Sequence, residues 1–366
     1  MRLSLLLLLF TSPLLALATD ESELIGKLGI RETSAASRDM AGWRTPKRIA
    51  LLDVGVPASG VGSLDWFAEA AGDVPVTLID PQSAGDASSA DVLLGWCSPT
   101  VIEAAESLRY LHVFSAGLDG CMRVEGIADR GLITTNSAKA ASETIAEHAI
   151  ALTLALSRNV HLYHQAQMES RWQRGFGEGS RATALTGKTM LVLGLGGIGS
   201  QVARRANALG MRVIATRNSS RSGPDYVDYV GLSGEMHQLA AQADAVVNAL
   251  PLTGATAGVV DEAFFAALKD GAYYVSVGRG GTTDTAALMS ALNSGKLGGA
   301  GLDVTDPEPL PDGHPLWQTP NVIITPHTAA SSALSVRNTM LIARENLRRY
   351  VAGEPLLNLV DLARGY

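Results

Sequence analysis

The sequence predicts an α/β protein made of two doubly wound domains, each built on a parallel β-sheet that helices cover. Short apolar runs alternate with helix-like stretches in two successive series, and a long, largely apolar helical segment lies between the two series. A glycine-rich turn follows the first strand of the second series. The chain of 366 residues, 46% of them hydrophobic, is long enough to bury two such cores.

The first residues are expected to form an export signal that is cleaved. Residues 1–18 begin with a basic start at Arg2, continue with an apolar run and end in Ala-Leu-Ala, the order that a signal peptide has. A permanent membrane anchor is the weaker interpretation, because polar residues and a proline interrupt the run, which is shorter than the ~20 apolar residues of a spanning helix. We therefore expect no stable membrane span and an exported protein, periplasmic or secreted.

The segment that follows is predicted to be a linker. Residues 19–47 are polar, rich in Ser, Arg and Glu, and short of periodic apolar positions. Met40 lies inside this segment, just before the first predicted strand. The alternative to export is therefore a cytoplasmic protein whose translation starts at Met40.

Charge and cysteine content limit the partners of the chain. The net charge of -7, without any block of Lys and Arg, predicts that nucleic acid is not a partner. The chain has two cysteines, Cys97 and Cys121, whose spacing matches no metal site, so we expect no metal. Two partly buried free thiols are favoured over a disulfide, which an exported chain would permit.

The first series predicts a substrate domain that starts with residues 48–136. A helix is expected at Ser98–Leu108, between two of its strands. The strands are expected at Arg48–Val54, Val74–Asp80, Asp91–Trp96 and Leu111–Ala116. The segment Ala140–Arg158 is apolar on most of its helical surface, which suits a helix buried between two domains and marks their boundary.

The second series, residues 137–329, predicts a nucleotide-binding domain inserted into the first domain. A last long helix, about Ser332–Tyr350, follows this series and is expected to return to the first domain, which residues 330–366 complete. Alternation of strands and helices is typical of a doubly wound sheet. Six strands are expected, at Met190–Gly194, Met211–Arg217, Ala245–Pro251, Ala272–Gly278, Gly299–Val304 and Asn321–Pro326.

The glycine-rich turn predicts where a dinucleotide binds. Gly194, Gly196 and Gly199 have G-x-G-x-x-G spacing, directly after an apolar strand and at the start of a helix. The first glycine permits the tight turn, the second lets the backbone approach a pyrophosphate, and the third lets helix and strand pack closely. Gly197 and Ile198 complete the turn and place the helix N-terminal amides toward the phosphates.

Arg217 predicts a preference between the two nicotinamide dinucleotides. It ends the second strand of this series, where an Asp or Glu would accept hydrogen bonds from the hydroxyl groups of the adenine ribose. A guanidinium group there, followed by serines and Arg221, suits a 2'-phosphate. We expect NADP to be the cofactor, with NAD possible if Arg217 only lies beside the adenine.

Three further stretches carry candidate catalytic residues and a family resemblance. Arg279, Glu308 and His327 each follow a predicted strand, at the edge of a parallel sheet where ligands bind. With these stretches in family order, the sequence resembles the D-isomer-specific 2-hydroxyacid dehydrogenases over roughly residues 48–357. The resemblance also includes the glycine-rich turn, Asn136, Glu147, His148, Trp172 and the stretch Leu250–Thr256.

The resemblance implies two Rossmann-like domains and an oxidoreductase that acts on small 2-oxo or 2-hydroxy acids. Hydride delivery to a 2-oxo acid leaves an alkoxide, and His327 is a suitable acid to protonate it. Glu308 would hold the other imidazole nitrogen and fix the ring's orientation. Arg279 would bind the substrate carboxylate as a fork and polarise the keto oxygen. Glu308 also argues against the formate-oxidising branch of the family.

Other site residues are implied by the resemblance alone. The loop Ser115–Gly120 matches the family's substrate-carboxylate loop, in which the backbone amides of Gly117 and Leu118 are donors. Pro251, Thr256, Gly278 and Asp303 match positions near the cofactor. A homodimer through the helix at Ala140–Arg158 is also implied.

Departures from the family pattern concern substrate preference more than reaction type. Gly278 stands where Ala is common before the catalytic Arg, and Ser276 stands where Asn is common. Thr305 stands where an aromatic residue often follows the Asp-Val pair.

The expected function is reduction of a glyoxylate- or hydroxypyruvate-type acid with NADPH. The alternatives are NAD-linked oxidation of a D-2-hydroxy acid and a dinucleotide-sensing co-regulator without turnover. Export conflicts in part with a soluble cofactor, because the leader lacks the paired arginines of signals for folded cargo.

Overall fold

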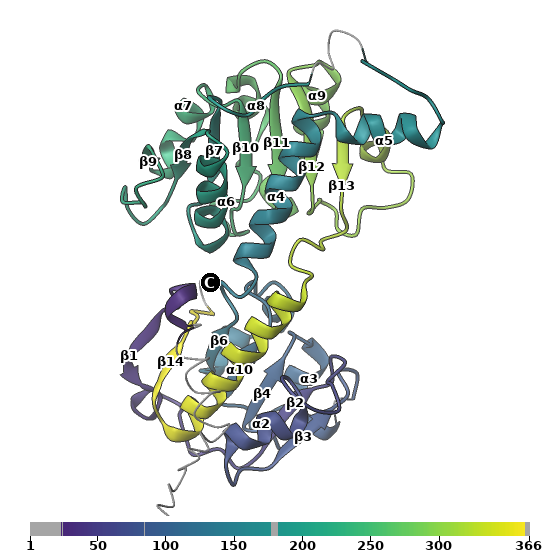
Figure 1. Ribbon diagram of the computed structural model, residues 1–366. Helices are drawn as coiled ribbons and strands as arrows, with labels where there is room; N and C mark the ends of the chain where they lie inside the picture. The colour runs from purple at the N-terminus through teal and green to yellow at the C-terminus, as the bar shows by residue number, and fades with distance from the viewer. Residues whose placement is uncertain (1–22, 24, 84, 177–181, 363–366) are drawn as a thin grey trace, which may run out of the picture. The chain divides into compact units, whose positions relative to one another are not determined.

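The computed structural model describes residue 23 and residues 25–83, 85–176 and 182–362. The chain divides into two compact units (Figure 1): unit 1 takes the residues up to 140 and from 336 onward, and unit 2 takes residues 141–335. The predicted borders lie after residues 136 and 329. The expected signal peptide, residues 1–18, lies outside the described residues. In the described part of the chain, no helix combines the length and the apolar character that a membrane span requires.

Unit 1 is built on a five-stranded parallel sheet with the strand order β3-β2-β4-β5-β6. Four of the strands confirm the predicted ones, whereas β6 was not predicted because its sequence, ITTN, is half threonine. The strands are β2 (Ile49–Leu52), β3 (Val76–Ile79), β4 (Val92–Gly95), β5 (Tyr110–Val113) and β6 (Ile133–Asn136).

Helices on both faces of this sheet explain why most of its strands are buried on both sides. The short helix α3 (Pro99–Ala104) packs its buried Val101 and Ile102 into one apolar cluster, and α2 (Leu64–Ala71) packs Trp66 and Phe67 into the other. The long helix α10 (Ala333–Ala352) joins the α2 cluster through Leu341, Ala343, Leu347 and Tyr350. The last helix therefore packs on the sheet of unit 1.

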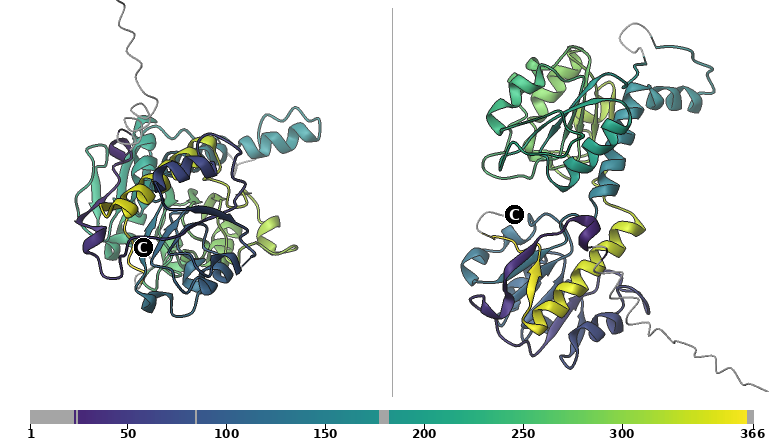
Figure 2. Two further views of the ribbon diagram at one scale, coloured as in Figure 1. Left: turned by 90° about the horizontal axis from the view of Figure 1, so that it is seen from below. Right: turned by 60° about the vertical axis from the view of Figure 1, so that its left-hand side comes forward.

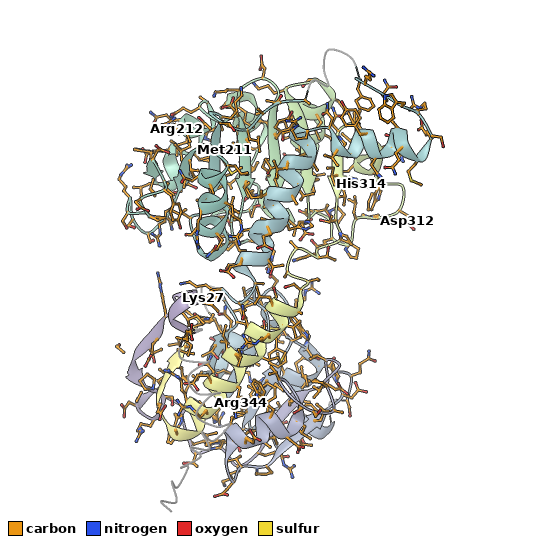
Figure 3. All side chains as sticks on the ribbon, viewed as in Figure 1. Lys27, Met211, Arg212, Asp312, His314 and Arg344 are labelled. Carbon is orange, nitrogen blue, oxygen red and sulfur yellow. A yellow bond between two sulfur atoms is a disulfide. The ribbon has the colours of Figure 1, made fainter. Side chains whose placement is uncertain are left out.

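One cation on α10 is buried against α2. This residue is Arg344, which Figure 3 labels on α10. Its guanidinium lies 4.8 Å from the ring centroid of Trp66, and its Nε donates to the Trp66 carbonyl oxygen at 2.9 Å. A second nitrogen lies 3.3 Å from the carboxylate of Glu69. These contacts satisfy the charge of a side chain that unit 1 buries almost completely.

The predicted linker is wrong for part of residues 19–47. β1 (Glu32–Ala36) pairs antiparallel with β14 (Pro355–Leu357) at the other end of the chain. Ser37 is fully buried, and Arg38 Nε donates to the Gly353 carbonyl oxygen at 2.8 Å. The polar sequence of β1 has no apolar alternation that would predict a strand. The strand forms because its main chain pairs with β14. A chain that starts at Met40 would lack this strand.

The expectation of two free thiols is also wrong. Cys97 and Cys121 form a disulfide, with their Cα atoms 4.8 Å apart. Cys97 follows β4 and Cys121 follows the loop after β5, and these strands are neighbours in the sheet. Two residues that are 24 positions apart in sequence thus meet at one edge of the sheet.

Unit 2 is built on a seven-stranded parallel sheet with the strand order β13-β12-β11-β10-β7-β8-β9. The six predicted strands are confirmed, and β9 (Tyr229–Gly231) is an additional edge strand of three residues. The six are β7 (Thr189–Leu193), β8 (Arg212–Thr216), β10 (Ala245–Asn248), β11 (Ala272–Ser276), β12 (Leu297–Leu302) and β13 (Val322–Ile324).

Helices cover both faces of the unit 2 sheet (Figure 1 and Figure 2). One face carries α4 (Ser142–Ser157) and α6 (Gly197–Ala208), whose buried residues form one cluster with the strands. The other face carries α7 (Met236–Ala240), α8 (Glu262–Ala267) and α9 (Thr285–Asn293). α4 is the predicted apolar helix, and α5 (Val160–Met168) follows it and extends away from the sheet of unit 2.

Candidate active site

One edge of the unit 2 sheet brings most of the predicted site residues together. The last residues of six neighbouring strands lie in register across the sheet, namely Thr216, Leu193, Asn248, Ser276, Leu302 and Ile324. Five steps of about 4.8 Å between neighbouring strands give a row of roughly 24 Å. An extended ligand can therefore lie along this edge, with one end at β8 and the other at β12 and β13.

The glycine-rich turn directly follows β7 and has the geometry that its spacing predicts. Gly194 has φ of +88°, a conformation that side chains disfavour. A Cβ atom on Gly199 would overlap the carbonyl oxygen of Gly194, so only glycine lets α6 pack this closely. A Cβ atom on Gly196 would meet nothing within 4 Å.

The open space at Gly196 fits a pyrophosphate group. Gly196 is the N-cap residue of α6, and Gly197 and Ile198 form its first turn, whose amides have no partner inside the helix. A phosphate placed there would accept hydrogen bonds from these amides and lie at the positive end of the helix dipole. The residues present therefore fit the diphosphate of a dinucleotide.

Two arginines lie in the loop after β8, and the structure distinguishes them. Arg217 is half-buried, and its guanidinium donates to the Ser222 carbonyl oxygen at 3.0 Å. The guanidinium of Arg221 lies 2.7 Å from the carboxylate of Glu235 and donates to Tyr229 Oη at 3.0 Å. Arg221 is thus neutralised by a carboxylate, whereas the described contacts of Arg217 are with a neutral carbonyl group.

The turn after β10 is held by Thr256. Its Oγ1 donates to the Pro251 carbonyl oxygen at 2.6 Å and accepts from the Thr253 amide at 2.8 Å. Next to this turn, a Cβ atom on Gly278 would lie 2.5 Å from the Leu250 carbonyl oxygen. The backbone at Gly278 therefore lies directly against the turn, which explains glycine at this position.

His327 and Glu308 form a hydrogen-bonded pair at the other end of the row. His327 Nδ1 lies 2.6 Å from Glu308 Oε1, and because a carboxylate only accepts, Nδ1 carries the proton and donates. The His327 side chain is 44% exposed and that of Glu308 is 40% exposed, so a ligand can reach the ring. Nε2, the nitrogen away from the carboxylate, is then available to a substrate.

Asp303 holds the loop that carries His327. Its carboxylate is buried and accepts from Thr325 Oγ1 at 2.6 Å and from the amides of Thr328 and Ala329 at 2.9 and 3.0 Å. Thr325 also hydrogen-bonds His148 Nε2 at 2.9 Å. Sequence reasoning placed Asp303 near the cofactor and missed these contacts, although the amides of Thr328 and Ala329, which follow His327, need acceptors.

Arg279 follows β11, which lies next to β12 in the sheet. It is half-buried, and its guanidinium donates to the Gly278 carbonyl oxygen at 2.9 Å. Arg279, Glu308 and His327 therefore follow three adjacent strands, β11, β12 and β13, at the same edge. The side chain can deliver a planar pair of donors to a carboxylate at that edge.

The predicted substrate loop lies in unit 1, after β5. Asn136 Nδ2 donates to the Ala116 carbonyl oxygen at 2.8 Å, and Ser115 Oγ donates to the Gly117 carbonyl oxygen at 2.6 Å. Within the described residues, the amides of Gly117 and Leu118 donate to no backbone or side-chain acceptor. They remain available to an anion, as the resemblance implies.

An open pocket of about 390 Å³ lies beside this loop in unit 1. Ala116, Asn136 and Ala138 line it, together with Arg31 just before β1, two residues of β1 and residues 358–360 after β14. The pocket adds a basic residue that sequence reasoning did not consider, because it assigned Arg31 to a linker.

His112 is buried in β5, before the substrate loop, and is not a candidate acid. Its Nδ1 lies 2.8 Å from Thr135 Oγ1 and its Nε2 lies 3.2 Å from Ser137 Oγ. Burial lowers the pKa of His112 from 6.5 to about 3. The ring is therefore neutral at physiological pH and acts as a polar core residue.

The sequence model of a protein family, described as the NAD binding domain of D-isomer specific 2-hydroxyacid dehydrogenases, matches residues 150–329 of this chain. The glyoxylate reductase/hydroxypyruvate reductase of Homo sapiens is 32% identical over 254 residues, which cover 69% of this chain and 77% of the human protein. The D-3-phosphoglycerate dehydrogenase of Archaeoglobus fulgidus is 34% identical over 268 residues, 72% of this chain. The match spans 49%, about half, of that dehydrogenase.

A solved structure shares the fold over most of the chain. The D-isomer specific 2-hydroxyacid dehydrogenase of Xanthobacter autotrophicus Py2, in complex with NADPH and MES, has a TM-score of 0.72 and 29% sequence identity. The similarity covers 88% of this chain and 100% of that one.

Proposed function

Because the chain belongs to the D-isomer-specific 2-hydroxyacid dehydrogenases, a family of NAD(P)-dependent oxidoreductases, we propose that it reduces a small 2-oxo acid with NADPH. The substrate would be of the glyoxylate or hydroxypyruvate type, and the product the D-2-hydroxy acid. The observation that carries the proposal is the His327–Glu308 hydrogen bond at the same sheet edge as the glycine-rich turn.

The chemistry assigns a role to each residue of the pair. A bound reduced nicotinamide would supply the hydride that reduces C2 of the acid. His327 Nε2 donates a proton to the oxygen that becomes the hydroxyl group. Glu308 keeps the ring oriented through Nδ1 and balances the positive charge that the ring carries before it gives up the proton.

Two groups bind and orient the acid. Arg279 holds the carboxylate as a fork and places positive charge near the keto oxygen. The family resemblance, without a contact in the structure, also assigns the amides of Gly117 and Leu118 to a substrate carboxylate. Fixed positions for carboxylate and carbonyl direct the hydride to one face of C2, which gives one product configuration.

The preference for NADPH is assigned to Arg217. The supporting observations are its place at the end of β8, its contact with a neutral carbonyl group, and NADPH in the Xanthobacter autotrophicus relative. The phosphates would lie at Gly196, Gly197, Ile198 and Gly199, and the nicotinamide end near Pro251, Thr256, Gly278 and Asp303. The assignment of Asp303 requires its carboxylate to accept from the cofactor in addition to the loop.

Initial rates with NADPH and NADH test the proposal. Glyoxylate, hydroxypyruvate and pyruvate are offered to the wild type, to Arg217→Asp and to the control Arg221→Gln. We expect faster turnover with NADPH, and in Arg217→Asp a fall of the NADPH-to-NADH preference of roughly 100-fold, the equivalent of two charge-assisted hydrogen bonds. Arg221→Gln should keep the preference, because Glu235 already neutralises that arginine.

Other outcomes of this experiment favour the alternatives. Equal or faster turnover with NADH, unchanged in Arg217→Asp, would remove the NADP assignment and favour NAD-linked oxidation of a D-2-hydroxy acid. Tight cofactor binding without turnover of any acid would favour a dinucleotide-sensing protein.

We also propose that the chain is exported and forms a homodimer. The composition of residues 1–18 supports export, and a mature protein that starts at Thr19 would agree with it, whereas a start at Met40 would contradict it. For the dimer, the support is the family resemblance and the exposed apolar side chains around α5, Met168 at 73% and Trp172 at 91%. A monomeric mass in sedimentation would contradict the dimer.

A further inference from the structure

The disulfide lies at the predicted substrate loop. Cys97 follows β4 by two residues, and Cys121 comes directly after the loop Ser115–Gly120. A Cβ atom on Gly120 would lie 3.0 Å from Cys97 Cβ, so the loop's last residue lies against the end of β4. The disulfide therefore ties the far end of the substrate loop to a strand of the central sheet.

Hydrogen bonds hold the near end of the same loop. Ser137 donates its amide to the Ser115 carbonyl oxygen at 3.2 Å, and Asn136 holds the Ala116 carbonyl oxygen at 2.8 Å. Gly117 and Leu118 lie between these bonds and the disulfide. Leu118 is buried in the same apolar cluster as Cys121, which is fully buried.

This arrangement matters because the two donors are backbone amides outside any helix or strand. Their direction depends on the local chain, and no side chain can compensate for a shift of the loop. Small displacements of groups that bind and orient a substrate weaken binding and catalysis strongly. A covalent link two residues after Asp119 limits such displacements.

We propose that the Cys97–Cys121 disulfide is a positioning element for the substrate carboxylate, so that the KM for the 2-oxo acid depends on the redox state of this cysteine pair. This inference rests on the proposed function, because it assigns the loop to the carboxylate. Reduction needs a dithiol as the reductant. The dithiol gives two electrons and two protons to the sulfur atoms of Cys97 and Cys121, so that their S–S bond breaks and two thiols form. The dithiol itself is oxidised to a disulfide.

The test compares three forms of the full-length protein. They are the oxidised wild type, the wild type reduced with dithiothreitol, with free thiols counted by mass after alkylation, and the variant Cys97→Ala/Cys121→Ala. We expect the KM for hydroxypyruvate to rise about tenfold in the reduced protein and in the variant, with a smaller change in kcat. The Kd for NADPH, which belongs to unit 2, should not change.

Controls separate the disulfide from side-chain truncation. The reduced wild type keeps every side chain, and the double variant should no longer respond to dithiothreitol. Met122→Ala changes an exposed neighbour of Cys121 and should keep the oxidised KM. Equal KM values in the three forms would overturn the proposal, as would a parallel rise of the Kd for NADPH, which would indicate general loosening.

A second readout separates this proposal from the proposed function. If the oxidised protein turns over no 2-oxo acid, the proposed function fails, and hydrogen exchange of residues 115–122 still tests the disulfide's effect on the loop. Faster exchange of this segment after reduction would support the positioning effect. Unchanged exchange would overturn it.

Discussion

At the scale of single residues, the account depends on Glu308 acting through His327. Glu308→Gln keeps the shape of the side chain but loses the charge, so we expect kcat to fall by about 100-fold, within the range for general acid catalysis, while the Kd for NADPH stays unchanged. Asp312→Asn is the control, because it removes an exposed carboxylate from the same segment. A kcat reduced equally by both substitutions would contradict the role of Glu308.

A second residue-scale prediction concerns His112 and stability. Because burial lowers its pKa from 6.5 to about 3, the unfolded chain takes up a proton below pH 6.5 that the folded chain excludes. The contribution of His112 is complete above that value and is lost as the pH falls toward 3. Between about pH 7.5 and about pH 5 the free energy of unfolding should fall by about 2 kcal/mol through this residue.

Urea unfolding at the two pH values measures this loss. The variant His112→Asn has no titrating ring, so its free energy of unfolding should depend less on pH by about the same 2 kcal/mol, whatever its absolute stability. An identical pH dependence in wild type and variant would show that the buried ring is not the source.

At the scale of elements, the turn between β7 and α6 separates packing from binding. Gly199→Ala would overlap the Gly194 carbonyl oxygen and should lower the melting temperature by several degrees. Gly196→Ala adds a methyl group in open space, so it should keep the melting temperature but lose at least tenfold in NADPH affinity, because the pyrophosphate needs that space. Calorimetric unfolding measures the melting temperatures of the two variants, and calorimetric titration measures their affinity for NADPH. NADPH affinity retained in Gly196→Ala would contradict the phosphate site.

The elements also show what sequence patterns can predict. Strands buried on both faces read as continuous apolar runs, so ten strands of the two sheets were predicted. β6 was missed because its threonines hide the apolar signal, and β1 because a short polar strand is held by main-chain bonds to β14, more than 300 residues away. Such pairings depend on the folded chain and leave no local periodicity.

At the scale of the whole molecule, family order predicted the site residues, but not the contacts that support them. The hydrogen bond between His327 and Glu308 agrees with the predicted pairing, whereas the use of Asp303 as an acceptor for the His327 loop was not predicted. The disulfide was not predicted because spacing alone does not place two cysteines at neighbouring strand ends. Sequence patterns thus indicate residues with a chemical signature and miss the residues that position them.

The central proposal is that the chain is a D-specific 2-oxo acid reductase. The most direct measurement is NADPH oxidation by the full-length protein with hydroxypyruvate, followed by determination of the product's configuration. The account predicts NADPH-dependent turnover that yields D-glycerate alone. Turnover that yields the L product, or none with hydroxypyruvate, glyoxylate or pyruvate and either cofactor, would contradict it.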